Sequence, residues 1–233
     1  MRVARAFAGL GFGVLACGLP STDEFAGGTP TTEPVDAGPE DASIVEAAPE
    51  VDAFVPSISI DPPVPSRPET IDLTATGALD WQAWSEPATR CAACAPWLGN
   101  VVVDGGSLDR YGDDDRTYTW SNGAPQASGS FRGGVLVAQL NGSMTLPVTA
   151  RARRAVVTLH TDVFHAAGVL SAQFAGEGDG PSVSVALGSE LYAFAVHIDA
   201  PPGRVVNIVW KVTGVDTDAY ANVALSAATV SPE

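Results

Sequence analysis

The stretch that decides the fold is Val205-Val-Asn-Ile-Val-Trp-Lys-Val212. Its apolar residues recur at every second position, so Val206, Ile208 and Trp210 would share one face of an extended strand. Similar short runs fill the chain from Glu69 onward, separated by Gly and Asn-Gly turn signals, and none has the sustained period of a helix. We therefore predict an all-β domain, an antiparallel β-sandwich of about ten to twelve strands arranged as a jelly roll.

The predicted domain covers residues 67–233 and is acidic. It carries 17 acidic and 10 basic residues, and its length suits one well-filled core. A negative domain repels phosphate backbones, so we expect no nucleic acid partner.

Residues 17–66 are predicted to be a disordered linker. From residue 18 to residue 66 there are ten acids, no Lys or Arg, and nine of the chain's 18 prolines. Such a segment buries too little apolar surface to offset the entropy of ordering it. Ile58 and Ile60 alternate as they would in an edge strand, but the flanking prolines argue against one.

The amino terminus resembles the signal peptide of a bacterial lipoprotein. Arg2 and Arg5 precede an eleven-residue apolar run, residues 6–16, that ends directly before Cys17. A membrane span needs about 20 apolar residues, so this run is too short to be one. The resemblance implies that residues 1–16 are removed and that Cys17 is acylated. Gly18 after the cysteine favours the outer membrane of a cell envelope, where the lipid would hold the protein on the membrane.

Three further segments resemble a bacterial β-sandwich module with the pattern DWxxW … YxWxDG, which is appended to secreted glycoside hydrolases and surface proteins. They are Ile71-Asp-Leu-Thr-Ala-Thr-Gly-Ala-Leu-Asp-Trp-Gln-Ala-Trp84, Tyr118-Thr-Trp-Ser-Asn-Gly-Ala-Pro-Gln-Ala-Ser128 and Asn222-Val-Ala-Leu-Ser-Ala-Ala-Thr-Val230. The resemblance implies a galactose-binding-like sandwich without catalytic activity, and it leaves the ligand open. Asn122 stands where the pattern has Asp, and the chain adds an insertion after Trp84.

That insertion contains Cys91 and Cys94 in a C-x-x-C spacing. A zinc site would need a second cysteine pair, which the sequence lacks. Outside the cytoplasm the two thiols are expected to oxidise, so we predict a structural disulfide between them.

Tryptophans are the residues that suggest a ligand, because sugar rings stack on exposed indole faces. Trp210 belongs to an apolar strand face and is assigned to the core. Trp84 shares the more polar face of its strand with Asp80 and Gln82, and Trp97 follows the cysteine pair. We predict that Trp97 and Trp84 line a binding surface; the alternative is that both cap one end of the sandwich.

An acidic stretch, residues 104–115, has five carboxylates within twelve residues. Hard oxygen ligands on a glycine-rich loop suit calcium, so Asp104, Asp109, Asp113 and Asp115 are the candidate ligands of a structural ion. Their spacing matches no known calcium loop, which favours a solvated acidic turn. No other cofactor is expected.

His160, Asp162 and His165 form a second group with metal-ligating side chains. His160 and Asp162 share a face if the segment is a strand, whereas His165 points the other way unless the chain turns at Phe164. We therefore do not expect these three residues to bind a metal together.

Enzyme signatures are absent from the sequence, which has no G-x-S-x-G, H-E-x-x-H or Walker motif. We predict a lipid-anchored, non-catalytic surface module that binds carbohydrate or another component of the cell envelope. One alternative is an assembly lipoprotein that recognises a surface protein. Another is a glycan hydrolase, whose two carboxylates leave no sequence motif, with Glu177, Glu190 and Asp199 as candidates.

Overall fold

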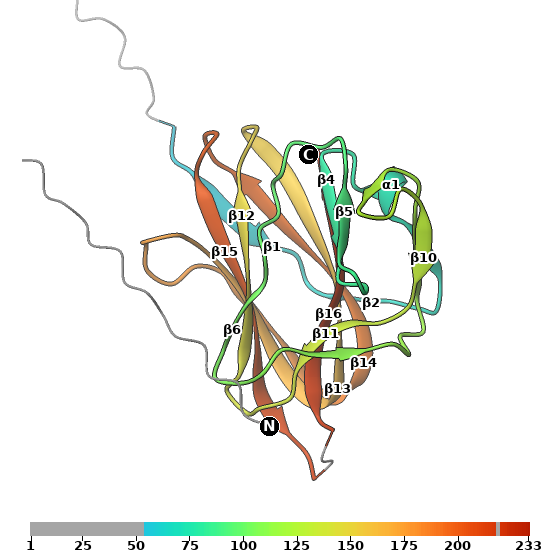
Figure 1. Ribbon diagram of the computed structural model, residues 1–233. Helices are drawn as coiled ribbons and strands as arrows, with labels where there is room; N and C mark the ends of the chain where they lie inside the picture. Colours follow the sequence, from blue (N-terminus) through green and yellow to red (C-terminus); the bar gives the residue numbers. More distant parts are fainter. Residues whose placement is uncertain (1–53, 218–219) are drawn as a thin grey trace, which may run out of the picture. The chain divides into compact units, whose positions relative to one another are not determined.

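The computed structural model describes residues 54–217 and 220–233. Nearly all of its regular structure is β, and the antiparallel strands curl into a sandwich (Figure 1), so the predicted fold class is confirmed. The predicted signal peptide, Cys17 and most of the predicted linker lie outside the described residues. No helix in the described ranges is long and apolar enough to span a membrane.

Strands are short in the first part of the described chain and long in the second. In chain order the elements are β1 (Ser57–Ile60), β2 (Val64–Pro65), β3 (Thr70–Asp72), α1 (Leu73–Thr76), β4 (Asp80–Ala83), β5 (Thr89–Cys91), β6 (Val102–Asp104), β7 (Asp109–Tyr111), β8 (Thr117–Trp120), β9 (Gly123–Ala124), β10 (Gly129–Phe131), β11 (Gly134–Val137), β12 (Ser143–Thr149), β13 (Arg154–Phe174), β14 (Ser182–Asp199), β15 (Val205–Val215) and β16 (Asn222–Ser231).

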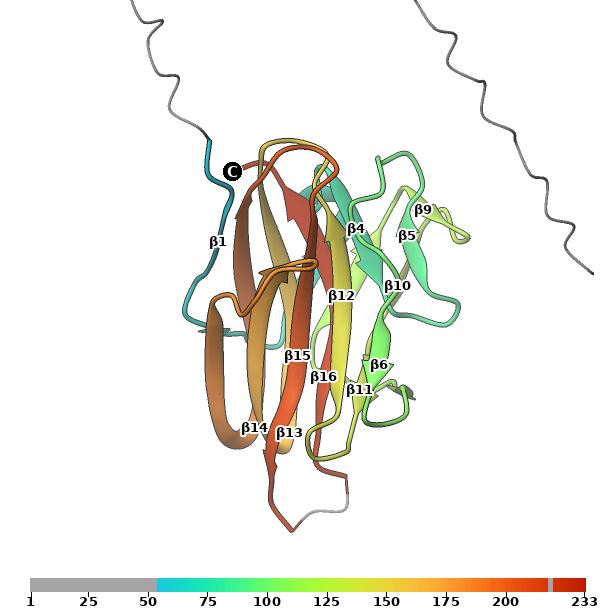
Figure 2. The same cartoon turned by 90° about the vertical axis from the view of Figure 1, so that its left-hand side faces the viewer.

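Strand β13 joins the two layers of the sandwich. Its first half, Val156–Phe164, pairs with β16, and its second half, Ala166–Phe174, pairs with β15. Strand β14 accompanies β13 along both halves, so the two form one long, curved hairpin (Figure 2). The main sheet then runs in the order β6-β12-β15-β13-β16-β4-β5-β9, with β11 also paired to β16.

The main core lies between these layers and matches the predicted alternation. On β15, Val206, Ile208 and Trp210 are buried while the residues between them are half-buried. The Trp210 indole packs so closely over Gly168 of β13 that a Cβ at that position would overlap the ring. A bulky aromatic residue therefore fits here only because the neighbouring strand β13 has a glycine, which has no side chain, at this position.

A third layer goes beyond the predicted pair of sheets. A separate three-stranded sheet, in the order β10-β8-β3, packs a second core that includes Trp81, Tyr118 and Trp120. The residues of β16 from Asn222 to Val230 are all buried, which alternation cannot reveal, because both faces of this strand are covered. Strand β3 ends at Asp72 because α1 begins at the next residue. The Asp72 carboxylate caps this helix by accepting from the N–H of Thr74 at 2.9 Å.

The predicted boundary at residue 67 is wrong, because the sandwich begins earlier in the chain. Strand β1 adds to the edge of β14 in antiparallel register, with Ser57 opposite Asp199 and Ile60 opposite Val196. The prolines that argued against this strand lie outside its four paired residues and therefore remove no ladder hydrogen bond.

Candidate functional site

A pocket of about 860 Å³ lies on the face of the main sheet that is turned away from the main core. Val163 points into that core, so its neighbours Asp162 and Phe164 on β13 face outward into the pocket. The other lining residues come from β7, the loop after it, the end of β11, the middle of β14 and the start of β16. The lining comprises Asp109, Tyr111, Asp113, Asp114, Asp115, Leu136, Ala138, Asp162, Val163, Phe164, Ser189, Glu190, Leu191, Tyr220 and Asn222.

A bend in β13 shapes one side of the pocket. The pairing with β14 shifts register between Val163 and Ala166, and His165 has a φ of 50° in the left-handed region. The backbone N–H of His165 donates to Ser189 Oγ at 3.0 Å, and its carbonyl accepts from the N–H of Asp216 at 3.0 Å. These bonds hold an unusual backbone conformation in the segment that carries Phe164 into the pocket wall.

Tyr111 connects the acids of the pocket floor. Its hydroxyl lies 2.9 Å from Asp162 Oδ2, 2.8 Å from Ser226 Oγ and 3.3 Å from Asp114 Oδ2. Burial, together with the charges of Asp162 and Asp114, raises the pKa of Tyr111 well above its ordinary value. The phenol therefore stays protonated and can donate its one proton to the nearer carboxylate, that of Asp162.

Asp114 and Arg116 form an ion pair beneath the pocket, and both side chains are buried. Arg116 Nη2 donates to Asp114 Oδ2 at 2.9 Å and Arg116 Nε donates to Asp114 Oδ1 at 3.1 Å. Burial disfavours the ionised form of Asp114, but the hydrogen bonds and charge of Arg116 outweigh it and hold the pKa of Asp114 below its ordinary value. Asp114 is thus a neutralised, structural carboxylate.

Asp162 is in a different situation. Its Oδ2 accepts from Tyr111, whereas its Oδ1 is buried and has no hydrogen-bond partner within the described structure. Burial raises the pKa of Asp162 to about 6, against the hydrogen bond from Tyr111. A carboxylate oxygen in a pocket wall without a donor is unfavourable and can be stabilised by a ligand that supplies one.

His160 lies on the same outward face as Asp162 but under the third layer. Its ring packs edge-on against Tyr118 with centroids 5.6 Å apart, and burial lowers its pKa to about 4, so it is neutral. The chain does turn beyond Phe164, and His165 Nδ1 lies 2.6 Å from Asp216 Oδ2. Within the described ranges, no three His, Cys, Asp or Glu side chains are grouped to hold a metal ion.

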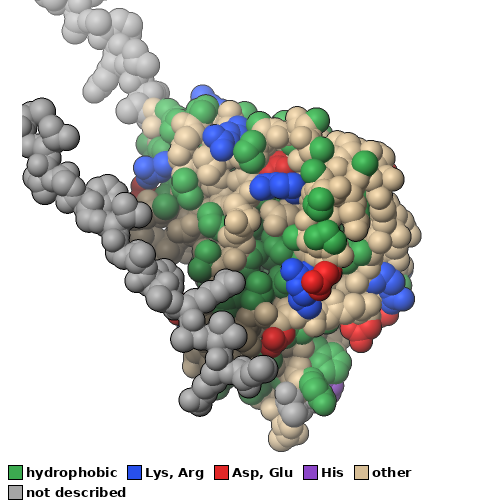
Figure 3. Space-filling view, viewed as in Figure 1, with side chains coloured by type: hydrophobic (Ala, Val, Ile, Leu, Met, Phe, Trp, Pro, Cys, Tyr) green, Lys and Arg blue, Asp and Glu red, His purple; other side chains and the backbone are tan. Residues whose placement is uncertain are grey.

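Two exposed aromatic side chains line the pocket. Tyr220 is 77% exposed and Phe164 is 41% exposed. Asp113, Asp115 and Glu190, also in the lining, are exposed too. On the face drawn in Figure 3, Lys and Arg side chains are scattered over the surface, with Asp and Glu side chains among them.

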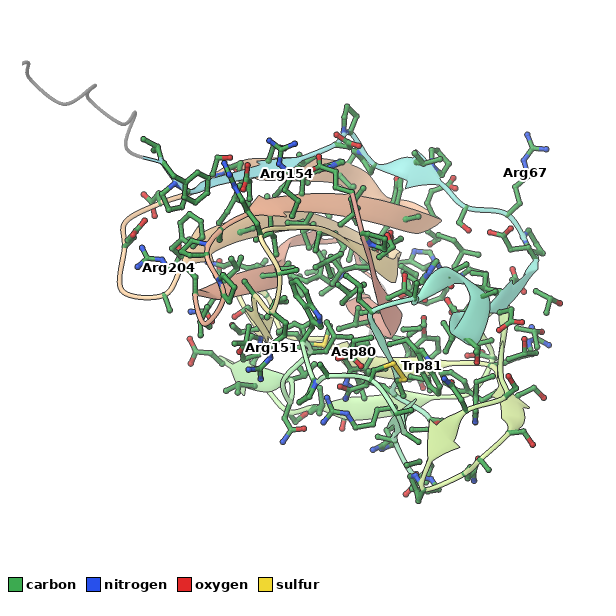
Figure 4. All side chains as sticks on the ribbon, turned by 90° about the horizontal axis from the view of Figure 1, so that it is seen from above. Arg67, Asp80, Trp81, Arg151, Arg154 and Arg204 are labelled. Carbon is green, nitrogen blue, oxygen red and sulfur yellow. A yellow bond between two sulfur atoms is a disulfide. The ribbon has the colours of Figure 1, made fainter. Side chains whose placement is uncertain are left out.

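The predicted exposure of Trp84 and Trp97 is wrong. They are 4% and 2% exposed, and both belong to the main core, so neither indole offers a face to a ligand. The buried Asp80 carboxylate explains why the backbone at Trp97 is held against the sheet. Its Oδ2 accepts from the N–H of Trp97 at 2.8 Å and from the N–H of Leu98 at 3.0 Å. Asp80 and Trp81 lie in the interior of the molecule, whereas Arg67 extends into solvent (Figure 4). The insertion is thus tied onto the sheet with its aromatic side chain inward.

The four candidate calcium ligands do not come together in one place. Asp109, Asp113 and Asp115 belong to the pocket lining, but Asp104 does not. Asp104 ends β6, which pairs with β12, whereas Asp109 begins β7, which pairs with β11. Proximity in the sequence is lost because the two strands join different partners.

The remaining predicted residues have structural surroundings. Cys91 and Cys94 form the predicted disulfide. Of the three candidate catalytic acids only Glu190 reaches the pocket, since Asp199 accepts from Arg153 and Arg154, and Glu177 pairs with Arg204. The sequence did not single out Tyr111, and it did not predict that Asp162 Oδ1 has no hydrogen-bond partner in the described residues. It did predict that Asp162 shares a strand face with His160.

No protein-family model and no curated protein matches this sequence. Among solved structures, the chain is similar to the enzymatically active domain of tailspike protein 4 from bacteriophage CBA120, with 11% identity and a TM-score of 0.36. The match covers 58% of this chain and 20% of that one. At this level of similarity the comparison carries no argument about function.

Proposed function

We propose that this protein is a non-catalytic carbohydrate-binding module that a lipid on Cys17 displays on a bacterial cell envelope. The observation that carries the binding proposal is the open pocket on the outward face of β13, where acids of β7, β13 and β14 meet two exposed aromatic rings. Sugars expose hydroxyl groups that donate to carboxylates and C–H faces that pack on aromatic rings, and this pocket provides both kinds of contact.

The size and surroundings of the pocket support a ligand larger than an ion. About 860 Å³ falls within the range of small-molecule sites and accommodates more than one sugar unit. The apolar residues Leu136 and Leu191 also belong to the lining, next to the carboxylates. A sugar ring, with polar edges and apolar faces, matches such a mixed wall.

Affinity electrophoresis against a panel of polysaccharides tests the binding proposal. The wild-type chain is expected to be retarded by at least one glycan, and Tyr220→Ala should abolish most of the retardation. Tyr220 is exposed, so its loss leaves the core intact. Val102→Ala, at an exposed apolar residue of β6 outside the lining, is the matched control and should behave as wild type. No retardation on any glycan would contradict the proposal.

Metabolic labelling with palmitate tests the anchor. We expect the wild-type chain to take up label and Cys17→Ala to remain unlabelled, because the thiol is the site of acylation in the resembled signal peptide. An unlabelled wild-type chain would contradict the lipid anchor and leave the binding proposal intact.

One observation favours a second function, hydrolysis of a glycan. Glycosidases pair a carboxylic acid of raised pKa with a second carboxylate, and Asp162, with a pKa of about 6, shares the pocket with Glu190. Release of reducing ends from a bound glycan, lost in Glu190→Gln, would replace the binding proposal with this one. Binding without any turnover would support the non-catalytic proposal.

A further inference from the structure

Building on the proposed function, we propose that the carbohydrate is cationic: an oligomer of sugars that bear free amino groups, with one ammonium held at Asp162. The inference names the ligand class of the same pocket and rests on the charge of its lining and on the unpartnered oxygen in its wall.

The charge of the lining excludes anionic ligands and favours cationic ones. Six lining residues are acids, and none of the described residues that line the pocket is Lys, Arg or His. Arg116 neutralises Asp114 from below, and Arg132 lies 3.6 Å from Asp115 in an exposed pair. Asp109, Asp113, Asp162 and Glu190 still leave an excess of negative charge, and in a concave site such charge attracts a cation more strongly than on an open surface.

Asp162 is the residue at which we place the ammonium group. Its Oδ2 is used by Tyr111, while its Oδ1 is buried and accepts no hydrogen bond within the described structure. Asp162 belongs to the pocket lining and the terminal torsion of an aspartate is broad, so its carboxylate can rotate to meet a donor that enters the pocket. A protonated amine would then donate a charge-assisted hydrogen bond to an oxygen that otherwise has none.

The rest of the lining selects an amino sugar over a bare cation. A metal ion would need several oxygens grouped around one point, and no such group of three occurs among the described residues. The pocket instead combines its acids with Phe164 and Tyr220, whose rings suit the C–H face of a sugar. Rings that carry ammonium groups use both features together.

Two oligomers that differ only in the charged group provide the test. Calorimetry would compare the full chain with a glucosamine hexamer and with the N-acetylglucosamine hexamer, which has the same backbone but no ammonium. We expect the glucosamine hexamer to bind at least about tenfold more tightly in low salt, and to lose most of this advantage at 1 M salt, where the Debye length falls to about 3 Å.

Variants separate the site from general attraction by an acidic protein. Asp162→Asn keeps the shape of the side chain and one acceptor oxygen for the Tyr111 hydroxyl but removes the charge, and it should remove most of the preference for glucosamine. Glu190→Gln, at an exposed residue of the lining, should lower the preference to a smaller extent and serves if Asp162→Asn fails to fold. Asp104→Asn removes one negative charge outside the lining and should change nothing.

The possible results distinguish the two proposals. Equal binding of both hexamers, or tighter binding of the N-acetylated one, would overturn the inference while the proposed function stands. An equal effect of Asp104→Asn and of both lining variants would also overturn it, because attraction would then be non-specific. Retardation by no glycan of the panel, with no calorimetric binding of either hexamer, would overturn the proposed function itself.

Discussion

The two faces of β13 differ in what they contribute. On the inner face, Leu159 and Val163 pack into the main core, and Thr161 between them has a buried, uncharged hydroxyl without a hydrogen-bond partner in the described residues. On the outer face, His160 and Asp162 each have a buried polar atom without a hydrogen-bond partner in the described residues. Both faces therefore bury an unpaired polar atom, but only on the outer face do these atoms belong to titratable side chains, whose pKa values burial shifts. Titratable groups with shifted pKa values are concentrated at functional sites.

The largest effect should come from the inner face. Trp210→Ala removes a fully buried indole that packs over Gly168, and we expect a loss of about 3–5 kcal/mol in the free energy of unfolding. Chemical denaturation with fluorescence detection measures this change. Tyr220→Ala, also an aromatic truncation but at an exposed residue, should change stability by less than about 0.5 kcal/mol. Similar losses of stability in both variants would contradict the assignment of Trp210 to the core and of Tyr220 to the surface.

The ion pair beneath the pocket tests whether the outer face carries stability as well. Arg116→Met leaves the buried Asp114 carboxylate without its partner, and the expected loss is about 3 kcal/mol in the free energy of unfolding. Adding Asp114→Asn in the same chain removes the uncompensated charge and should restore part of the loss. A double variant no more stable than Arg116→Met would show that the buried charge is not the cause.

The pH dependence of ligand binding tests the role of the Asp162 carboxylate. Its pKa is raised to about 6, chiefly by burial, and a bound ammonium favours the ionised form and lowers that pKa. The amines of the glucosamine hexamer also begin to lose protons towards neutrality, which lowers the affinity of every variant alike. The ratio of wild-type to Asp162→Asn affinity should therefore rise about five- to tenfold between pH 5 and pH 7. The charged and titratable groups that line or support this pocket are Tyr111, Arg116, the acids Asp109, Asp113, Asp114 and Asp115 and, from β14, Glu190.

Calorimetry at a series of pH values measures this dependence. Asp162→Asn should lack the rise that comes from Asp162, since its side chain does not titrate, and should keep only the change that comes from the amines of the ligand and the other acids. An unchanged profile in Asp162→Asn would assign the pH dependence to another group and contradict the role of Asp162.

The smallest effect concerns the edge of the domain, where β1 pairs with β14 outside the pocket lining. His197 lies between Asp61, 3.0 Å from its Nε2, and Glu233, 3.1 Å from its Nδ1. The hydrogen bond with Asp61, aided by Glu233, raises the pKa of His197 above its ordinary value of 6.5. The charged ring thus adds stability that is complete below pH 6.5 and is lost as the pH rises through the pKa of the folded protein.

Exposed pairs of this kind contribute roughly 0.2–1 kcal/mol, so the difference in stability between wild type and His197→Gln should be small. It should be larger at pH 5.5 than at pH 9, as measured by urea unfolding at the two values. A difference that grows toward high pH would contradict the assigned charge state.

The sequence by itself allowed much of the fold to be predicted. The apolar alternation of β15 placed Trp210 in the core, and the Cys91–Cys94 spacing predicted the disulfide. Both predictions succeed because they depend on local geometry: side chains alternate along a strand, and two cysteines three residues apart can meet in a turn. The third layer was missed because β16 is covered on both faces, so its burial has no period of two.

The candidate site was much less predictable. The expected indoles of Trp84 and Trp97 are buried, and the Asp80 carboxylate that fastens the second of them acts across 17 residues. The acids of the acidic stretch were noticed, but the division of Asp104 from Asp109 depends on which strands β6 and β7 join.

Alternation, composition and cysteine spacing therefore determined an acidic, disulfide-bonded β-sandwich. Only the tertiary structure decided that Tyr111, Asp162 and Glu190 share one pocket, because β7, β13 and β14 meet there through pairing and through the bend at His165. This difference arises because some features depend on neighbouring residues and others on residues far apart in the chain. A strand's own residues decide which side chains share a face, whereas the neighbour that each face meets depends on the hydrogen-bonded order of strands far apart in the chain.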